Sequence, residues 1–388
     1  MKVALVHELL TLRGGAERVL RVFAEMFPEA PIYTLLYDEK KLGDWFPRHR
    51  VRSAQFPAHY ALLPNFQFSI FNFQFRFNHH LYLSKFPQAI EAWDFSAFDL
   101  VISSSSAFAH NIITNGKPKH LSFIHSPARY LWDRTHDVLE QAGSGLFGPL
   151  KRMYLKRVFH TLRLWDAESA ARADHIIVSS KEVQRRVELY WRRGSTVVYP
   201  PIDDFWLHTH DSPLTTHHSP LTIHDSQSYF LVVSTLVPYK RIELAIAACN
   251  TLNIPLVIVG EGPDRKRLQK LAGPTVTFLG YSSKENLSDL YRNAKATIVP
   301  GDEDFNLVAL ESMACGTPVI AFGAGGPLET VIEGATGEFF REPTAESLEK
   351  ILSGFDRKRY QTDTCQNRAK EFSKETFQKN IRAEIDRL

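Results

Sequence analysis

The sequence predicts an α/β protein made of two doubly wound domains, each with a parallel sheet covered by helices on both faces. Short apolar, β-rich runs alternate with longer helical patterns along the chain, which is the rhythm of parallel strands joined by crossover helices. A length of 388 residues is enough for two domains of ordinary size. The rhythm breaks near the middle at Pro200-Pro201, which cannot continue a helix or a central strand.

The strands are predicted where apolar runs are bounded by polar or turn-forming residues. In the first half they are Val3–His7, Leu100–Ser103, His120–Ile124 and His175–Val178. In the second half they are Tyr229–Val233, Leu256–Val259, Val276–Leu279, Ala296–Val299 and Pro318–Ala321. The helices predicted between them include Ile242–Thr251, Arg265–Leu271, Glu285–Asn293 and one opened by Phe305. Since ligands of such sheets bind beyond the carboxyl ends of the strands, the residues after the strands are the first candidates for a site.

This pattern also predicts the domain boundaries. Residues 1–199 form the first domain and residues 203–367 the second, and a helix is expected over residues 368–388, where Phe372 and Ile381 lie on or near one face. The polar, imperfect repeat from Ser212 to Asp225 is predicted to be a surface loop, with metal binding by its histidines as the alternative.

Composition excludes several classes of protein. Lys and Arg number 46 against 43 Asp and Glu, so no charge field indicates nucleic acid as a partner. The three cysteines are too few and too far apart for a disulfide framework or a zinc site, which indicates a reducing cytoplasm. No signal peptide is evident, and no apolar run approaches the roughly 18 residues of a spanning helix. We expect a cytoplasmic protein, either free or peripheral to the inner membrane.

The stretch Val299–Ala321 is the most informative part of the chain, because it predicts a strand, a polar loop, a helix and a second strand. Glu303 lies in the loop just before the helix, and Glu311 follows about two turns later. The amide end of a helix attracts an anion such as phosphate, whereas carboxylates accept hydrogen bonds from hydroxyls. A ligand that meets both demands carries phosphate and sugar together, as a nucleotide sugar does.

Other candidates also follow predicted strands. A phosphate could meet the backbone of the turn at Gly14 and Gly15, although such a pair is often only a turn. Lys240 and Arg241 stand at a helix start, and Gly325-Gly326 precede a further short helix. Cations and amide groups at these places would stabilise negative charge on a departing phosphate.

Taken in chain order, these motifs resemble the family-4 retaining glycosyltransferases of the GT-B fold. The resemblance runs through VHELLTLRGGAERVL, FIHSPARYLWD, VVYPPID, the stretch ending in Lys240, the E-x7-E spacing of Glu303 and Glu311, and GGPLETV. It implies two Rossmann-like domains with a cleft between them and a final helix that crosses back to the first domain. It also implies transfer of a sugar from a nucleotide-sugar donor without a metal or another cofactor.

The resemblance implies a role for each candidate residue. Glu303 contacts the donor sugar, Glu311 holds the ribose, and His125 positions the reacting centre. The remaining donor-binding candidates lie at a glycine turn or a helix start: Gly14, Gly15, Lys240, Arg241, Phe305, Asn306 and Leu307. The acceptor-binding candidates lie near the glycine turn or after His125: Glu17, Arg129, Trp132 and Asp133. For His125 the alternative is a hydrogen bond to local backbone groups, and for Lys240 the alternative is an exposed lysine at a helix start.

Two positions depart from the family pattern. Asn306 stands where the family usually has Gly, and Thr235 stands where an Arg usually contacts the diphosphate. A third feature, Asp302-Glu303-Asp304, superficially matches the metal-binding D-x-D element of other glycosyltransferases, but it leads directly into the E-x7-E helix. Metal independence therefore remains the expectation.

Aromatic residues recur densely from Phe56 to Phe86, interleaved with cations such as Arg76 and Lys85. Core packing is one interpretation, and a surface that meets the inner membrane face and a lipid-linked acceptor is the other. Aromatic residues beside cations also suit binding of single-stranded nucleic acid, but no other feature of the sequence supports that interpretation.

The predicted function is transfer of a sugar, with GDP-mannose as the first donor, onto a glycan or lipid-linked acceptor. The mannosyltransferase-like branch that builds bacterial surface polysaccharide, including lipopolysaccharide, is the nearest resemblance. The alternatives are a nucleotide-sugar 2-epimerase and a relative that only binds a glycan or a partner.

Overall fold

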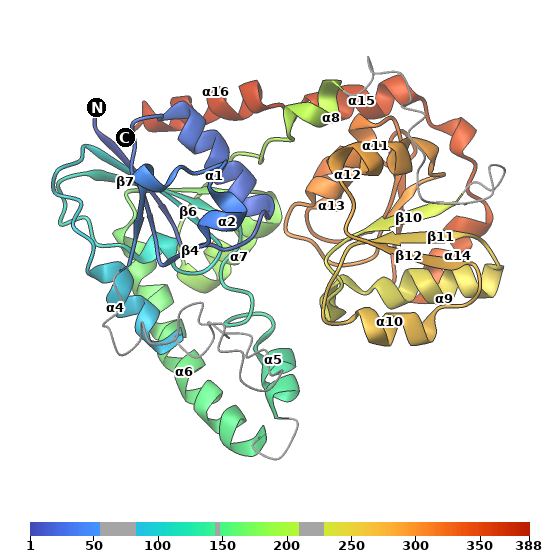
Figure 1. The fold of residues 1–388 in the computed structure, drawn as a ribbon, viewed down its shortest axis with the longest axis horizontal. Coiled ribbons are helices and arrows are strands. Elements are labelled where there is room, and N and C mark those ends of the chain that lie inside the picture. The colour runs from blue at the N-terminus through green and yellow to red at the C-terminus, as the bar shows by residue number, and fades with distance from the viewer. Residues whose placement is uncertain (55–82, 144–147, 209–228) are drawn as a thin grey trace. The chain divides into compact units, whose positions relative to one another are not determined.

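The computed structural model describes residues 1–54, 83–143, 148–208 and 229–388 (Figure 1). These residues form two compact units. The first unit comprises Met1–Ser179, Val183–Val198 and Ile381–Leu388, and the second comprises Ser180–Glu182 and Tyr199–Asn380. The chain therefore leaves the first unit and returns to it more than once.

The first unit is built on a seven-stranded parallel sheet with the order β5-β3-β1-β6-β7-β8-β9. Its strands are β1 (Val3–His7), β3 (Ile32–Thr34), β5 (Val51–Ser53), β6 (Leu100–Ser105), β7 (Lys119–Ile124), β8 (His175–Val178) and β9 (Thr196–Val197). A small parallel pair joins β2 (Leu9–Leu10) to β4 (Leu36–Tyr37). The described helices are α1 (Gly15–Met26), α2 (Glu39–Leu42), α4 (Phe86–Glu91), α5 (Thr135–Ala142), α6 (Gly148–Ser169) and α7 (Lys181–Trp191).

Both faces of this sheet are buried. Ala4 and Val101 pack with Phe108 in one core cluster, whereas Ile124 and Val178 pack with residues of α7 in another. A parallel sheet that is covered on both sides needs continuous apolar strands, which is why β1, β6 and β7 were readable in the sequence.

The second unit contains a six-stranded parallel sheet with the order β12-β11-β10-β13-β14-β15. Its strands are β10 (Phe230–Val233), β11 (Leu256–Val259), β12 (Val276–Gly280), β13 (Thr297–Val299), β14 (Val319–Phe322) and β15 (Gly337–Phe340). Its helices are α8 (Asp204–His208), α9 (Ile242–Leu252), α10 (Arg265–Leu271), α11 (Lys284–Asn293), α12 (Leu307–Ala314), α13 (Pro327–Thr330), α14 (Ala345–Ser353) and α15 (Thr362–Lys370). Helix α16 (Lys374–Ile385) begins in the second unit and ends in the first.

The predicted fold class, with two parallel α/β sheets, is confirmed. The predicted strands agree with the structure to within two residues at each end, and the predicted helices of the second half to within a similar margin. The helix expected to open at Phe305 begins at Leu307, because Asn306 caps it.

The single helix expected over residues 368–388 was wrong. The structure has α15 and α16 with a break at Glu371–Ser373. Phe372 lies in this break and packs into the core of the second unit, with its ring 5.4 Å from Tyr199 and 5.7 Å from Phe305. Burial of this one aromatic side chain fixes the turn between the two helices.

Two predictions fall on residues outside the described ranges: most of the aromatic segment from Phe56 to Phe86, and the repeat from Ser212 to Asp225. All three cysteines are free and buried, as small interior thiols are. Among the described residues, no helix combines the length and the apolar character that crossing a bilayer requires.

Candidate active site

Lys240 and Glu303 form an ion pair at the carboxyl end of the second sheet. Lys240 ends a short 3-10 turn after β10, and Glu303 follows β13. Because β10 and β13 are neighbours in the sheet, the segments after them meet at the same edge. The Lys240 Nζ atom lies 2.7 Å from Glu303 Oε1 and 2.5 Å from Oε2.

Lys240 retains its positive charge although the pair is largely buried. The Lys240 side chain is 20% exposed and the Glu303 side chain 14%. Burial opposes the positive charge, but the carboxylate of Glu303 outweighs burial and raises the pKa of Lys240 above its ordinary value. A cation and an anion therefore stand together at the sheet edge where ligands of this architecture bind.

Gly325 and Gly326 support the loop that carries Glu303. The Gly326 N–H donates to the Glu303 carbonyl oxygen at 2.7 Å, so this amide is already engaged within the protein. A Cβ atom on Gly325 would lie 2.3 Å from the same carbonyl, and one on Gly326 would lie 2.3 Å from the Phe305 Cα. The glycine pair therefore allows a close approach between two backbone segments.

The start of α12 explains the residue at position 306. Asn306 has φ 75° and its side chain accepts a hydrogen bond from the Ala309 N–H at 3.0 Å. Asn tolerates this left-handed conformation better than most residues and also caps the helix, so it meets both local demands. The Phe305 side chain is buried and stacks on Tyr199, so it is engaged within the second unit.

Glu311 lies on α12 and is almost fully buried. Its carboxylate accepts a hydrogen bond from the Tyr291 hydroxyl at 3.1 Å, which fixes its orientation. Arg241 adopts a left-handed conformation and packs over the Phe322 ring, with 5.6 Å from the guanidinium carbon to the ring centre. Lys240 and its neighbour Arg241 therefore have different partners.

In the first unit, His125 belongs to a buried polar network at the carboxyl ends of β1, β6 and β7. The His125 Nε2 atom lies 2.8 Å from the Ser104 hydroxyl. His7 lies opposite Ser104 in the β1–β6 register, and its Nδ1 atom is 2.8 Å from the Ser104 carbonyl oxygen and 3.2 Å from the hydroxyl. Ser104 therefore joins the two histidines.

The pKa values of the two histidines are shifted in opposite directions. Burial lowers the pKa of His125 to about 3, and the proximity of His7 acts in the same direction. Burial also opposes a proton on His7, but Glu17 and Glu8 outweigh it and raise the pKa of His7. His125 is therefore neutral at physiological pH, and His7 is the member of the network that favours a proton.

Glu17 connects this network to the glycine turn. Its Oε1 atom lies 3.8 Å from His7 Nε2, and its Oε2 atom accepts a hydrogen bond from the Gly14 N–H at 3.0 Å. Gly14 precedes α1, which begins at Gly15, and a Cβ atom on Gly14 would lie 2.6 Å from the Glu17 carboxylate. The Gly14 amide is thus bound by Glu17 within the first turn of α1.

Sequence reasoning missed Glu8 and Ser104. Glu8 is buried, and its Oε1 atom accepts a hydrogen bond from the Ser106 N–H at 2.6 Å. Its Oε2 atom is buried without a hydrogen-bond partner among the described residues. The sequence signal that could have identified Glu8 was a carboxylate placed directly after the apolar first strand.

The expected acceptor residues after His125 are held by contacts within the first unit. Arg129 and Asp133 pair with each other at 3.1 Å, and Asp133 also lies 3.7 Å from Arg186. The Trp132 indole donates to Asp166 at 2.8 Å and stacks on Tyr190. Within the described part of the chain, no group of three or more His, Cys, Asp or Glu side chains is arranged to hold a metal ion.

Residues 215–372 match the family model described as Glycosyl transferases group 1. Over 184 residues the chain is 31% identical to a GDP-mannose-dependent alpha-mannosyltransferase of Mycolicibacterium smegmatis, which is 45% of this chain and 46% of that protein. It is 26% identical over 208 residues to an uncharacterized glycosyltransferase of Methanocaldococcus jannaschii, covering 52% of this chain and 55% of the relative. The chain thus spans about half the length of these curated relatives.

Two solved structures extend the likeness to the whole chain. HepE of Anabaena, solved in complex with UDP, superposes with a TM-score of 0.70 over 100% of both chains at 18% identity. Sucrose-phosphate synthase of Thermosynechococcus elongatus superposes with a TM-score of 0.64 over 99% of this chain and 98% of the other, also at 18% identity. At this identity the likeness concerns the fold. The protein has the GT-B fold, and its residues 215–372 resemble the glycosyl transferases group 1 family.

Proposed function

We propose that this protein is a retaining, metal-independent glycosyltransferase that transfers a sugar from a nucleotide-sugar donor to a glycan or a lipid-linked glycan. The observation that carries the proposal is the buried ion pair of Lys240 and Glu303 at the carboxyl end of the second sheet. A cation suits the diphosphate of the donor, and a carboxylate beside it suits the hydroxyls of the sugar.

In this proposal, Glu303 accepts hydrogen bonds from the donor sugar and Glu311 from the ribose. The Tyr291 hydroxyl keeps the Glu311 carboxylate in place for that contact. Lys240 and backbone amides at the start of α12 bind the diphosphate and stabilise the charge that it gains as the sugar–oxygen bond breaks. The acceptor hydroxyl attacks the sugar on the face that the diphosphate leaves, and its proton passes to the departing phosphate oxygen.

His125 is proposed to position the reacting groups rather than to exchange protons. A histidine with its pKa lowered to about 3 does not carry a proton near neutral pH. Its hydrogen bond with Ser104 orients the ring.

The donor is proposed to be GDP-mannose, with UDP-glucose as the competing choice. The first is supported by relatives named GDP-mannose-dependent alpha-mannosyltransferases, of which one is 35% identical over 126 residues. The second is the donor in a solved HepE structure, which has a TM-score of 0.69. The pattern of relatives in sequence favours mannose, and a donor panel separates the two.

The test incubates the protein with each nucleotide sugar and short glycan or lipid-linked acceptors, and follows the products by mass spectrometry. We expect free nucleotide and an extended acceptor with the wild type, and a loss of both with Glu303→Gln. Glu346→Gln makes the same chemical change on exposed α14 and is the matched control, with activity near that of the wild type. An epimerised nucleotide sugar, or donor binding without any product, would contradict the proposal.

A further inference from the structure

Helix α6 of the first unit carries exposed apolar side chains in its first turns, ahead of its buried apolar side chains. Val158, Phe159 and Leu162 are buried against the first unit. Leu150 is 63% exposed, Met153 64% and Tyr154 48%, although these side chains are apolar or aromatic. Their spacing of three and four residues places them on one outer stripe of the helix. Among the described residues, Leu150, Met153 and Tyr154 belong to none of the buried core clusters.

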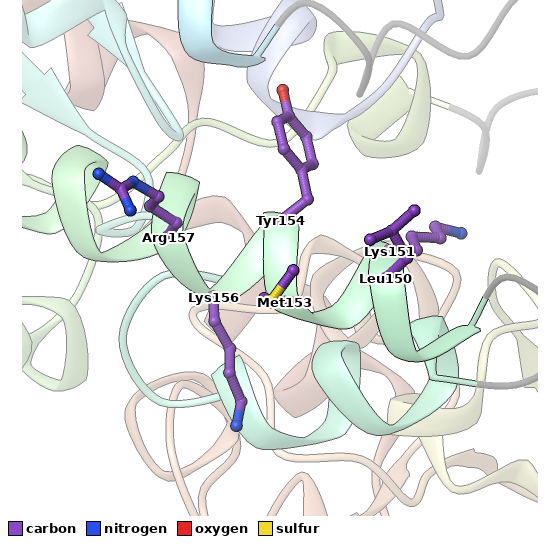
Figure 2. Close-up of a pocket in the computed structure, with 6 residues that line it drawn as sticks. All are labelled: Leu150, Lys151, Met153, Tyr154, Lys156 and Arg157. Atoms are coloured by element: carbon purple, nitrogen blue, oxygen red, sulfur yellow. The ribbon is translucent and has the colours of Figure 1, made fainter.

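Cations surround these exposed apolar side chains. Leu150, Met153 and Tyr154 line one surface pocket together with Lys151, Lys156 and Arg157. We call these six residues the α6 surface, and Figure 2 shows their side chains projecting from successive turns of the helix.

The charge of the α6 surface is not compensated. Residues 148–165 contain no Asp or Glu, and Arg152 adds a further exposed cation. No ion pair of Lys151, Lys156 or Arg157 with a carboxylate is present among the described residues. In Figure 1 the first turns of α6 lie beside α5 and away from the sheet of the first unit.

We propose that the α6 surface docks the protein onto an anionic lipid bilayer. The two kinds of side chain on it match the two layers of such a bilayer. Lys151, Lys156 and Arg157 suit the phosphates of the headgroups, while Leu150 and Met153 gain by leaving water for the acyl boundary. Tyr154 has the apolar ring and polar tip that favour the boundary between them.

The combination of cations and apolar side chains favours an anionic bilayer over other binding partners. Nucleic acid would use the cations but would leave Leu150 and Met153 in contact with water or phosphate. A second copy of the chain would bring the same uncompensated cations against each other across a symmetric contact. An anionic bilayer alone satisfies the apolar stripe and the cations at once.

The helix would lie along the membrane plane, with its buried face still packed on the first unit. Long Lys and Arg side chains reach past the apolar stripe to the headgroups, so that both can be satisfied in one orientation. Docking of this kind is separate from sugar transfer, and it concerns residues that the proposed donor site does not use.

The test measures co-sedimentation of the full chain with vesicles in the absence of donor and acceptor. We expect binding to vesicles of phosphatidylcholine with phosphatidylglycerol at low salt, weak binding to pure phosphatidylcholine vesicles, and a loss of binding as salt increases. The double variant Lys151→Glu/Lys156→Glu should reduce the partition coefficient at least tenfold. Leu150→Ser should reduce it about threefold or more, since apolar burial contributes independently of charge.

Two controls match these variants. Lys266→Glu/Lys270→Glu changes the net charge by the same amount on exposed positions of α10, and Leu271→Ser removes an exposed leucine from the end of that helix. Both should bind vesicles like the wild type. Circular dichroism melting of every variant verifies that each one is folded, which is expected for substitutions at exposed positions.

Three results would overturn the proposal. The first is the absence of vesicle binding at low salt. The second is binding that the α6 variants and the α10 controls change equally. The third is evidence for another partner. This would be a lipid-free dimer that the α6 variants dissociate, or a nucleic acid that binds as tightly as the vesicles and whose binding Leu150→Ser leaves unchanged. Because no nucleotide sugar is present, failure here leaves the proposed sugar transfer untouched, and the reverse also holds.

Discussion

The two units differ in the protonation of a buried basic side chain at the carboxyl end of their sheets. In the second unit, Lys240 keeps its proton because Glu303 stands 2.5 Å away. In the first unit, His125 gives up its proton, because burial lowers its pKa to about 3 and the nearby His7 acts in the same direction. The same burial thus yields a charged pair in one unit and a neutral hydrogen-bonded ring in the other.

This difference separates two tasks. An ion pair can exchange partners with a ligand that carries both phosphate and hydroxyl groups, so the second unit is suited to donor binding. A neutral ring such as that of His125 can be held in a fixed orientation by its hydrogen bond to Ser104, which suits a positioning role. Variants in each unit test whether this division of roles holds.

The largest expected effect is on the charged pair. Lys240→Met should lower kcat by about a hundredfold to a thousandfold, because it removes the cation that stabilises the departing diphosphate. Nucleotide release with the preferred donor measures this effect, and Lys266→Met on exposed α10 is the control. Turnover close to that of the wild type would show that the diphosphate relies on backbone amides alone.

The next effect concerns neutral histidines of the first unit. His120 is fully buried on β7, and burial lowers its pKa to about 3. Since the unfolded chain accepts this proton at about pH 6.5, the stabilising contribution is complete above that pH and declines as pH falls toward 3. At pH 5 the free energy of unfolding should be lower by about 2 kcal/mol than at pH 7.5.

Urea unfolding of the wild type and His120→Gln at both values measures this contribution. The variant should lose most of the pH dependence attributed to His120. Replacement of exposed His49 by Gln should leave it intact. Equal pH dependence in all three proteins would mean that His120 is not held neutral by burial.

A smaller effect is expected at the positioning contact. Ser104→Ala removes the hydroxyl 2.8 Å from His125 Nε2 and should lower kcat about fivefold, with little change in the KM for the donor. Ser104→Thr should recover most of the loss. Ser105 is the matched control, because it is a buried serine on the same strand whose hydroxyl lies 2.9 Å from His110 instead. A purely structural role for Ser104 would lower thermal stability without this split between kcat and KM.

The smallest effect is expected for Asn306→Gly. Gly relieves the left-handed backbone at φ 75° but loses the side-chain cap, so the two effects nearly cancel. Asn306→Gly should change the free energy of unfolding by no more than about 0.5 kcal/mol, whereas Asn306→Ala loses both advantages and should cost about 2 kcal/mol. Chemical denaturation of the second unit distinguishes these outcomes.

The parts of the fold that could be predicted are those with a continuous apolar signal. Strands such as β1 and β11 are buried on both faces, so their sequences read as uninterrupted apolar runs. Strand β15 was missed because it begins with Gly337, which usually indicates a turn. A Cβ atom there would lie 1.9 Å from the Val319 carbonyl oxygen, so glycine is required by the neighbouring strand rather than by a turn.

The candidate site, like the fold, could be predicted from the sequence only in part. The resemblance singled out Lys240 and Glu303 as separate donor contacts, but their direct ion pair was not predicted. Glu17 was expected near an acceptor, but the structure binds its carboxylate to Gly14 and places it beside His7. The meeting of His7, Ser104 and His125 depends on the strand order β1-β6-β7, and single polar residues at strand ends do not reveal that order.

The return of Ile381–Leu388 to the first unit has a consequence for how the protein is made. Glu384 lies 2.7 Å from His175, which begins β8. Since a ribosome synthesises residue 175 long before residue 384, this contact must wait until the second unit has been translated. A nascent chain stalled before Ile381 would therefore expose an incomplete amino-terminal half, and brief protease treatment of such stalled complexes should cut it more readily than the released protein.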